Sequence, residues 1–223
     1  MAEKKSIQSV VRALEILEYL VDNGDKCRLQ DISEGLNLNK STVYTLLSTL
    51  EQKGYVEHDA DSPRYSLGLS CWQLGAISRR NMFPSIKSRW LLEQLVDSLE
   101  ETCCFVFPCG QQYFYIDGIT PSRSVSADSR IGSFQSMNRE CAISRLFRLW
   151  STDSEHCPEY TFDEGEDQPG VNALAMPLVV NGKLIGIFAV YGIASRFTSD
   201  KAAPAYELYK KLRTTVLSED FHE

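Results

Sequence analysis

The sequence predicts an α/β protein of two domains: an N-terminal winged helix-turn-helix over residues 1–68 and a C-terminal α+β domain over 84–223, joined by a helix at 69–83. Three observations support this. Apolar residues recur at helical spacing up to residue 53, a two-strand pattern follows at once, and from Cys103 the apolar period shortens toward strand alternation. With 223 residues and 43% hydrophobic content, the chain is long enough to bury two cores.

Three helices are expected in the first domain. The first begins at Ser9, a second covers about 29–35, and a third covers 40–53, with Asn39 as its N-cap and Gly54 as its stop. Gly35-Leu36-Asn37-Leu38 predicts a tight turn before the third helix. Apolar residues three and four positions apart predict one buried face on each helix: Val10, Ala13, Leu14, Leu17, Leu20 and Val21; Leu29, Ile32 and Leu36; Val43, Leu46, Leu47 and Leu50.

A β-hairpin is expected directly after the third helix. Residues 55–58 and 64–67 have strand character, and the segment 59–63 between them is rich in turn-forming residues. Gly68 closes the unit. Helix, helix, turn, helix and hairpin, in this order, are typical of a winged helix-turn-helix.

The third helix carries a polar face opposite its apolar stripe. Short hydroxyl side chains let a helix enter the major groove, and the first turn of a recognition helix meets base edges. A polar face is usually only solvated, but its place within three helices and a wing favours DNA binding. Arg64, expected at the tip of the hairpin, is expected to reach a flanking phosphate or the minor groove. The residues expected at double-stranded DNA are Lys40, Ser41, Thr42, Tyr44, Thr45, Ser48 and Arg64, with Thr49 on the same face.

The joining helix is expected to need a partner surface. Leu69, Trp72, Leu74 and Ile77 lie within its predicted span and give it an apolar character. A lone winged domain also contacts too short a site for useful specificity. Both points predict a homodimer or a dimer of dimers.

The second domain is expected to be a GAF-like α+β sensor domain, a sheet flanked by the first and last helices of the region. Asn181-Gly182 is a strong two-residue hairpin signal. The stretch 151–168 is expected to be irregular, and its acidic run 163–167 to be a solvated loop. The expected elements are helices at 85–101, 140–150 and 201–217, and strands at 103–108, 112–118, 122–127, 171–180 and 183–191.

Charge and composition limit which partners and which cellular compartment are compatible with the sequence. The net charge is −7, with 10 basic and 11 acidic residues in 1–80 but 13 and 19 in 81–223. A local basic face therefore remains compatible with DNA binding in the first third of the chain. No apolar run approaches a membrane span, and no signal core follows Met1, so a soluble, cytoplasmic protein is expected. The seven cysteines are expected to be free thiols.

The sequence resembles the IclR family of regulators over nearly its whole length. The resemblance implies a DNA-binding domain, a dimerising linker helix and a C-terminal domain that binds a small effector, in repressors or activators that form dimers or tetramers. It is specific in the first 70 residues and patchy afterwards. The residues that carry it are 9–17, Lys40-Ser41-Thr42-Val43-Tyr44, Leu46-Leu47, Leu50-Glu51, Gly54-Tyr55-Val56, Tyr65-Ser66-Leu67-Gly68, Gly170-Val171, Ala175-Met176-Pro177, Gly182, Gly186 and Ala194-Ser195-Arg196.

Departures from the family pattern concern the effector pocket. The resemblance places Cys141, Ala142, Arg145, Ala173, Ala189 and Tyr191 at that pocket. Glu140, Ile143 and Ser144 replace the usual Thr, Gly and Lys, and alanines or a tyrosine stand where polar groups often bind a carboxylate. The stretch 151–168 is shorter than usual, and Thr45 stands where Arg is frequent. A bulkier, partly aromatic ligand or no ligand is therefore expected, because alanine offers no hydrogen bond to a small acid.

Other functions have weaker support in the sequence. Adjacent Cys103 and Cys104 lack the spacing of a zinc site, so no metal or cofactor is expected, and buried thiols are favoured over a redox sensor. None of the three histidines has a recognisable catalytic partner, so no enzyme is expected. The aromatics of the predicted strands are expected mainly in the core, except Tyr191, which the resemblance places at the pocket. Arg139 and Arg145 are expected mainly on a solvated face, with a role as cations for an anionic ligand as the alternative. Two hypotheses remain: a ligand-responsive DNA-binding regulator, or a DNA-binding dimer whose C-terminal domain is a ligand-free structural or interaction module.

Overall fold

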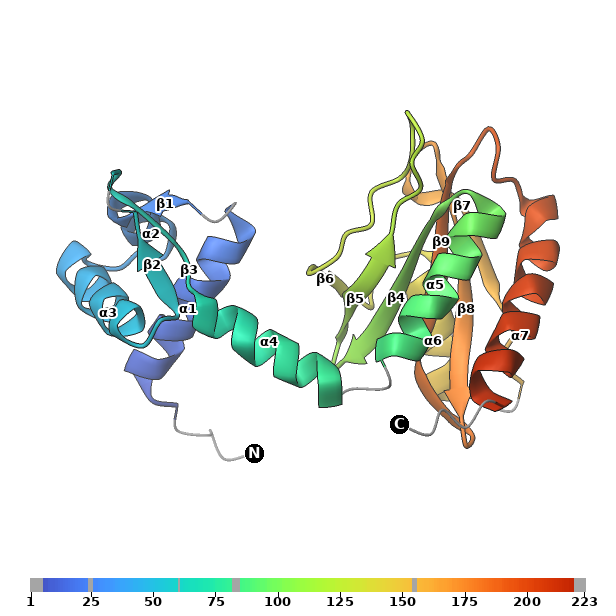
Figure 1. The fold of residues 1–223 in the computed structure, drawn as a ribbon, viewed down its shortest axis with the longest axis horizontal. Coiled ribbons are helices and arrows are strands. Elements are labelled where there is room, and N and C mark those ends of the chain that lie inside the picture. Colours follow the sequence, from blue (N-terminus) through green and yellow to red (C-terminus); the bar gives the residue numbers. More distant parts are fainter. Residues whose placement is uncertain (1–5, 24–25, 60, 82–84, 154–155, 219–223) are drawn as a thin grey trace. The chain divides into compact units, whose positions relative to one another are not determined.

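The molecule consists of two compact units, Met1–Phe83 and Pro84–Glu223, each built around its own antiparallel sheet (Figure 1). The computed structural model describes residues 6–23, 26–59, 61–81, 85–153 and 156–218. Among these residues, no helix is long and apolar enough to cross a membrane.

The N-terminal unit is a three-helix core closed by a small sheet. Its elements are α1 (Gln8–Asp22), β1 (Cys27–Arg28), α2 (Leu29–Gly35), α3 (Lys40–Gln52), β2 (Val56–His58), β3 (Arg64–Leu67) and α4 (Leu69–Asn81). The strand order is β1-β3-β2. The two-residue strand β1 was not predicted; it pairs with β3 and anchors the chain ahead of α2 to the wing.

The turn between α2 and α3 holds the two helices of the motif together. Asn37 adopts a left-handed conformation (φ +51°), which asparagine tolerates better than most residues. The Ser33 hydroxyl donates to the Leu38 carbonyl oxygen at 2.6 Å across the turn. A Cβ at Gly35 would lie 2.2 Å from the Tyr19 ring, so any other residue would force that ring to move. The predicted turn is confirmed, although Asn39 makes no side-chain capping bond.

The apolar residues of α1 divide between two faces, which corrects the prediction of one buried stripe. Ile16 and Leu20 are fully buried with Val43 and Leu47 of α3. A second set remains exposed at spacings of three, four and seven residues: Ile7, Val10, Val11, Leu14 and Val21. Helical periodicity identifies an apolar helix, but it does not say whether every apolar residue faces the same core.

The C-terminal unit is a six-stranded antiparallel sheet with helices on both faces. The strand order is β6-β5-β4-β9-β8-β7. Its elements are α5 (Ser85–Leu99), β4 (Thr102–Cys109), β5 (Gln112–Ile119), β6 (Phe134–Ser136), α6 (Ala142–Thr152), β7 (Thr161–Gln168), β8 (Val171–Val180), β9 (Lys183–Ile193), a 3-10 turn (Ser199–Lys201) and α7 (Ala202–Ser218).

The two faces of this sheet have different covers. Helices α5 and α7 contact each other and cover one face, whereas α6 lies on the other face over β7, β8 and β9 (Figure 1). Phe188 of β9 meets Tyr209 of α7 with ring centroids 5.6 Å apart. Its neighbours Ala189 and Tyr191 belong to the cluster under α6. Successive side chains of β9 thus point to opposite faces of the sheet and pack into the two cores on either side of it.

Two predictions in this unit are wrong. Residues 122–127 form no strand; the carbonyl groups of Val125 and Ala127 instead accept hydrogen bonds from the side chains of Arg196 and Thr102. The acidic run 163–167, predicted as a solvated loop, lies in edge strand β7, which pairs with β8. Charged residues are typical of edge strands, where they mask the strand signal in the sequence.

The hairpin between β8 and β9 confirms its prediction. Asn181 and Gly182 have φ values of +51° and +72°, as a two-residue turn with both central residues left-handed requires.

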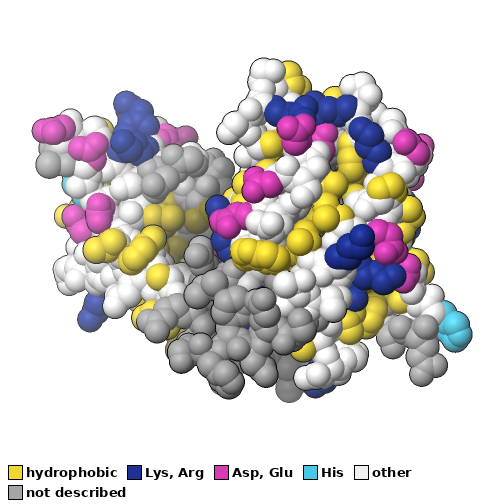
Figure 2. Space-filling view, turned by 45° about the vertical axis from the view of Figure 1, so that its right-hand side comes forward, with side chains coloured by type: hydrophobic (Ala, Val, Ile, Leu, Met, Phe, Trp, Pro, Cys, Tyr) yellow, Lys and Arg dark blue, Asp and Glu magenta, His cyan; other side chains and the backbone are white. Residues whose placement is uncertain are grey.

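Elsewhere on the surface, basic side chains lie beside acidic ones at several places on the face seen in Figure 2. Arg89 with Asp117 and Arg196 with Glu101 are two such ion pairs in the C-terminal unit.

Candidate functional site

One surface of α3 presents the polar side chains predicted at DNA. Because residues three and four apart are neighbours on a helix surface, Lys40, Ser41, Tyr44 and Thr45 form a continuous exposed surface, and Tyr44 is 61% exposed. Thr42 and Ser48 are half-buried at the margins of this surface. The buried Val43 and Leu47 hold the helix from behind.

The hydroxyl groups of this face already have local partners. Thr45 Oγ1 donates to the Ser41 carbonyl oxygen and Thr49 Oγ1 to the Thr45 carbonyl oxygen, both at 2.9 Å. These hydrogen bonds fix the side chains and leave the oxygens able to accept from base amino groups. Lys40 Nζ lies 3.4 Å from Gln30 Oε1 of α2, which joins the starts of both helices of the motif.

Arg64 lies at the start of β3 rather than at the tip of the wing. Its guanidinium donates to the Lys26 carbonyl oxygen at 2.8 Å, and Arg64 pairs in register with Arg28 of β1. The described part of the tip is acidic: the Asp59 carboxylate accepts from the Asp61 N–H, which lowers the pKa of Asp59. The basic part of the wing is thus the β1–β3 edge.

Two exposed apolar surfaces lie on the helices of the same unit. One is the outer face of α1, where Val10 and Leu14 are 52% and 53% exposed. The other is α4, where Trp72 is 72% exposed and Leu69, Leu74 and Ile77 are more than half exposed. Monomeric proteins rarely expose so many large apolar side chains, so both surfaces are candidate interaction surfaces.

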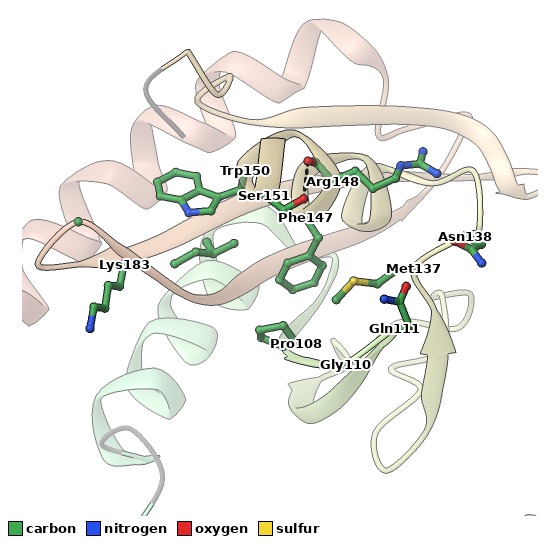
Figure 3. Close-up of a pocket in the computed structure, with 12 residues that line it drawn as sticks. Pro108, Gly110, Gln111, Met137, Asn138, Phe147, Arg148, Trp150, Ser151 and Lys183 are labelled. Atoms are coloured by element: carbon green, nitrogen blue, oxygen red, sulfur yellow. Dashed lines mark hydrogen bonds between the residues drawn. The ribbon is translucent and has the colours of Figure 1, made fainter. Parts of the chain in front are cut away.

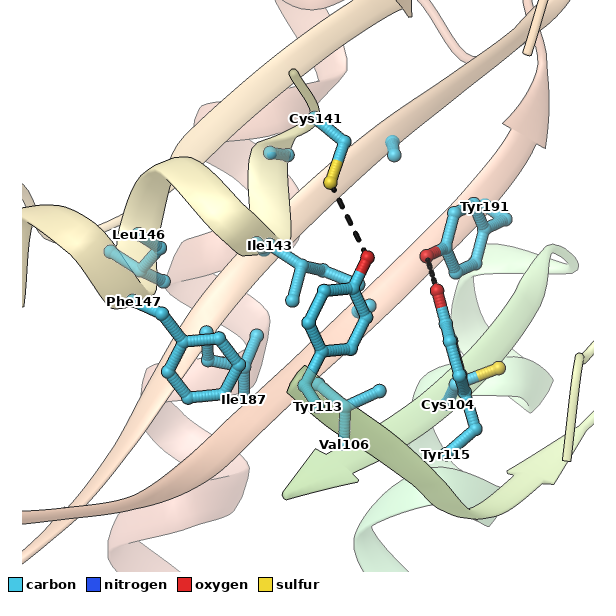
Figure 4. Packing of buried hydrophobic residues seen from close by; sticks show 14 of the residues in the cluster. Cys104, Val106, Tyr113, Tyr115, Cys141, Ile143, Leu146, Phe147, Ile187 and Tyr191 are labelled. Atoms are coloured by element: carbon cyan, nitrogen blue, oxygen red, sulfur yellow. Dashed lines mark hydrogen bonds between the residues drawn. The ribbon is translucent and has the colours of Figure 1, made fainter. Parts of the chain in front are cut away.

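In the C-terminal unit, five of the six residues predicted at the effector pocket lie in a closed core beneath α6. These are Cys141, Ala142, Ala173, Ala189 and Tyr191, each no more than 5% exposed. The space among them is occupied by Tyr113 and Tyr115, which are fully buried (Figure 4).

Hydroxyl and thiol groups pair inside this cluster. The Tyr115 and Tyr191 hydroxyl oxygens are 2.5 Å apart, and the Tyr113 hydroxyl lies 3.5 Å from Cys141 Sγ (Figure 4). Burial raises the pKa of all three tyrosines, which stay neutral at physiological pH. The cluster is therefore uncharged and internally satisfied at these hydroxyls.

The cations predicted near an anionic ligand are engaged with carboxylates. Arg145 pairs with Glu166, and it also donates to the Phe162 carbonyl oxygen at 3.1 Å. Arg139 Nε donates to Asp167 Oδ1 at 2.7 Å, and Arg130 donates to Asp167 Oδ2 at the same distance. Strand β7 thus supplies acidic partners to three arginines.

Asp163 is the site residue that the sequence reasoning missed. It is fully buried opposite Ala173 in the β7–β8 register, although its acidic neighbours suggested a solvated loop. Its Oδ1 accepts from the Glu166 N–H at 2.7 Å, whereas Oδ2 has no hydrogen-bond partner among the described residues. Burial raises the pKa of this carboxyl. Strand alternation on β7, with Thr161 and Asp163 inward, was the available signal.

An open cavity of about 700 Å³ lies farther along the same face, outside the tyrosine cluster (Figure 3). The turns after β4 and β8 and the C-terminal half of α6 surround it. The sequence reasoning did not predict it. Its lining residues are Pro108, Gly110, Gln111, Met137, Asn138, Phe147, Arg148, Trp150, Ser151, Gly182, Lys183 and Leu184.

The cysteines of the sheet are poorly suited to redox chemistry. Cys103 and Cys104 are fully buried, and burial raises the pKa of Cys104 to about 12 and that of Cys103 well above its usual value. Thiols in this state hold little of the reactive thiolate. Within the parts of the chain that the structure covers, no group of three or more His, Cys, Asp or Glu side chains could hold a metal ion.

Comparisons with known proteins bear on the N-terminal unit first. Residues 9–60 match the IclR helix-turn-helix domain. The HTH-type transcriptional regulator XynR of Escherichia coli is 29% identical over 149 residues, which are 67% of this chain and 59% of that protein. Residues 9–60 thus form a helix-turn-helix domain of the IclR type. The glycerol operon regulatory protein of Streptomyces coelicolor is 41% identical over 71 residues, 32% of this chain and 28% of that protein. The chain thus aligns with 59% or less of the length of these relatives.

Solved structures extend the likeness to both units. An IclR transcriptional regulator from Alicyclobacillus acidocaldarius superposes with a TM-score of 0.80 at 23% identity, covering 95% of this chain and 98% of that one. An IclR homologue from Microbacterium hydrocarbonoxydans, complexed with 4-hydroxybenzoate, has a TM-score of 0.78 at 12% identity, covering 93% and 97%. The IclR-type fold, with a winged helix-turn-helix and a C-terminal α+β domain, is therefore confirmed. The relatives named above are themselves named as regulators, XynR as a transcriptional regulator and the Streptomyces protein as the regulator of a glycerol operon.

Proposed function

We propose that this protein is a DNA-binding transcriptional regulator, a repressor or an activator, that acts as a homodimer or a dimer of dimers and senses a small molecule through its C-terminal domain. The observation that carries the proposal is the exposed polar surface of α3 formed by Lys40, Ser41, Tyr44 and Thr45. It lies on the third helix of an IclR helix-turn-helix, the element that enters the major groove in this motif.

Contacts to DNA divide into reading and positioning. Tyr44 and Thr45, with Thr42 and Ser48 at the margins, are placed to meet base edges, because they lie on the outer surface of α3 toward its N-terminal end. Lys40 and Ser41 lie in that first turn, near the free N–H groups of the helix start, which attract phosphate. Arg64 joins Arg28 at the β1–β3 edge, where both suit the phosphate backbone.

Dimerisation is supported by the two apolar surfaces on α1 and α4. Leu14 on α1 and Trp72 on α4 are more than half exposed to solvent. Burying these side chains against a second copy would remove apolar surface from water. A two-fold dimer would present two α3 helices to half-sites about one helical turn apart, or a multiple of it, on pseudo-palindromic DNA.

The sensor role has a competing hypothesis with its own observation. The tyrosine cluster fills the space among Cys141, Ala142, Ala173, Ala189 and Tyr191, which favours a C-terminal domain that binds no ligand at that place. A ligand there would have to displace Tyr113 or Tyr115. Two- and three-carbon acids such as glyoxylate and pyruvate are expected to bind weakly or not at all, because tyrosine rings fill the space and the alanines offer no donor.

Selection from random duplexes by the full-length protein tests the DNA-binding proposal. We expect an enriched pseudo-palindrome, lost or relaxed in Tyr44→Ala with a cost of about 1–3 kcal/mol. Arg64→Ala should weaken all sequences about equally and reduce the salt slope by roughly one. Lys211→Ala, an exposed change on α7, is the matched control and should alter neither property. Absence of any enriched motif at moderate salt would refute the proposal.

A further inference from the structure

We propose that the cavity beside the C-terminal half of α6 is a binding site for an aromatic monoanion, separate from the tyrosine cluster. The cavity measures about 700 Å³, within the range of roughly 300–1,000 Å³ typical of small-molecule sites. Its role as an effector site rests on the proposed regulatory function, but the binding itself does not.

The walls of the cavity suit a flat apolar group. Phe147 and Trp150 come from α6, Pro108 from β4 and Leu184 from β9, and Met137 closes the far side (Figure 3). Aromatic rings stack favourably on such walls beyond the effect of the buried area, and a methionine adapts to ring edges. The chemistry of the walls therefore favours a planar ring over a sugar or a small acid.

The rims of the cavity are built by two tight turns, so the opening is formed in advance. Gly182 in the β8–β9 turn and Gly110 in the β4–β5 turn both have positive φ values, +72° and +59°. Glycine adopts this backbone without the steric cost of a Cβ atom. A preformed site avoids the ordering cost that a flexible one adds to binding.

A positive charge at the rim selects an anion. Lys183 lies at the mouth of the cavity and forms no ion pair with any described residue. Arg148, by contrast, donates twice to the Glu140 carboxylate, at 3.0 and 3.1 Å, and is largely neutralised. One uncompensated ammonium group beside aromatic walls matches one carboxylate on an aromatic ring.

Phe147 connects this cavity to the tyrosine cluster. Its ring lines the cavity and also lies 6.0 Å, centroid to centroid, from the ring of Tyr113. A ligand stacked on Phe147 would therefore press on the core that contains Tyr115 and Tyr191. The tyrosine cluster and the cavity therefore share Phe147, but only the cavity has room for a ligand.

Calorimetry on the full-length protein tests the proposal with two matched probes, 2-naphthoate and the neutral 2-naphthalenemethanol. We expect the acid to bind at least threefold more tightly. Lys183→Met should weaken 2-naphthoate about three- to tenfold and leave the neutral probe unchanged, because an exposed ion pair contributes up to about one decade in affinity. Trp150→Ala should weaken both probes about tenfold. Lys211→Met on α7 is the charge-matched control and should change nothing.

Hydrogen exchange locates the ligand and separates the outcomes. Protection by 2-naphthoate should concentrate at 108–111, 147–151 and 181–184. The proposal would be overturned if millimolar 2-naphthoate gave neither a heat of binding nor protection from exchange. It would also be overturned if neither Lys183→Met nor Trp150→Ala changed the affinity. Self-association that Trp150→Ala abolishes would overturn it as well, since a second copy would then fill the cavity. Binding without DNA selection would refute only the regulatory function, and DNA selection without binding would refute only this site.

Discussion

The hydroxyl pair between Tyr115 and Tyr191 allows a double-mutant cycle on the closed core. Tyr191→Phe removes one hydroxyl and deprives the fully buried Tyr115 hydroxyl of the partner 2.5 Å away. Losing a buried partner costs about 1–3 kcal/mol, whereas removing both partners together is far less costly. Each single variant should therefore lose about 1–3 kcal/mol of unfolding free energy, and the double variant should fall short of the sum by about 1–2 kcal/mol.

Urea unfolding followed by near-ultraviolet circular dichroism measures these free energies through the packed tyrosines. The matched control pairs Tyr191→Phe with Tyr209→Phe. Tyr209 is also buried and donates to the Pro177 carbonyl oxygen at 2.9 Å, but from the opposite face of the sheet. That double variant should be additive within about 0.5 kcal/mol. If Tyr115→Phe and Tyr191→Phe are equally additive, the two hydroxyls do not pair, and the account of a closed cluster fails.

Three further predictions follow from burial and charge. Asp163→Asn should stabilise the protein by about 1 kcal/mol at pH 7, because burial raises the pKa of Asp163 and its contribution is present at low pH and lost as pH rises; denaturation at pH 4 and 7 should show a gain that grows with pH, and a constant gain would contradict this. In native protein at pH 8, iodoacetamide should modify exposed Cys109 but not Cys104, whose pKa is about 12, and peptide mapping that finds both equally modified would refute the burial argument. Leu14→Glu and Trp72→Glu should give monomers by light scattering, whereas the equally exposed Val125→Glu should not; unchanged assembly in the first two would exclude α1 and α4 as the interface.

The sequence predicts the N-terminal unit well because local signals and tertiary packing agree there. Gly35 and Asn37 mark a turn that needs close approach and a left-handed residue, and the structure uses both. On α1 the same periodicity misleads, since Leu14 is apolar and exposed while Ile16 is apolar and buried. Only the position of the neighbouring helices distinguishes the two, and that information is not local.

The candidate site of the C-terminal unit was harder to predict for a physical reason. Alignment to a family places Ala189 and Tyr191 by strand register, but it does not reveal that Tyr113 and Tyr115, distant in sequence, fill the space between them. Asp163 was hidden by its acidic neighbours, because charge density in a sequence indicates solvent unless strand alternation is weighed against it. The cavity arises where two turns and a helix end converge, and no contiguous motif encodes that meeting.

The two edges of the large sheet limit how copies of this protein can associate. Edge strand β6 spans only Phe134–Ser136, and the other edge, β7, carries Glu164, Glu166 and Asp167. A short edge offers few free backbone groups to a passing strand, and the ion-paired side chains and the register shift between Glu164 and Gln168 interrupt the other edge. Sheet-to-sheet polymerisation is thus disfavoured, and the exposed apolar surfaces of α1 and α4 remain the candidates for self-assembly.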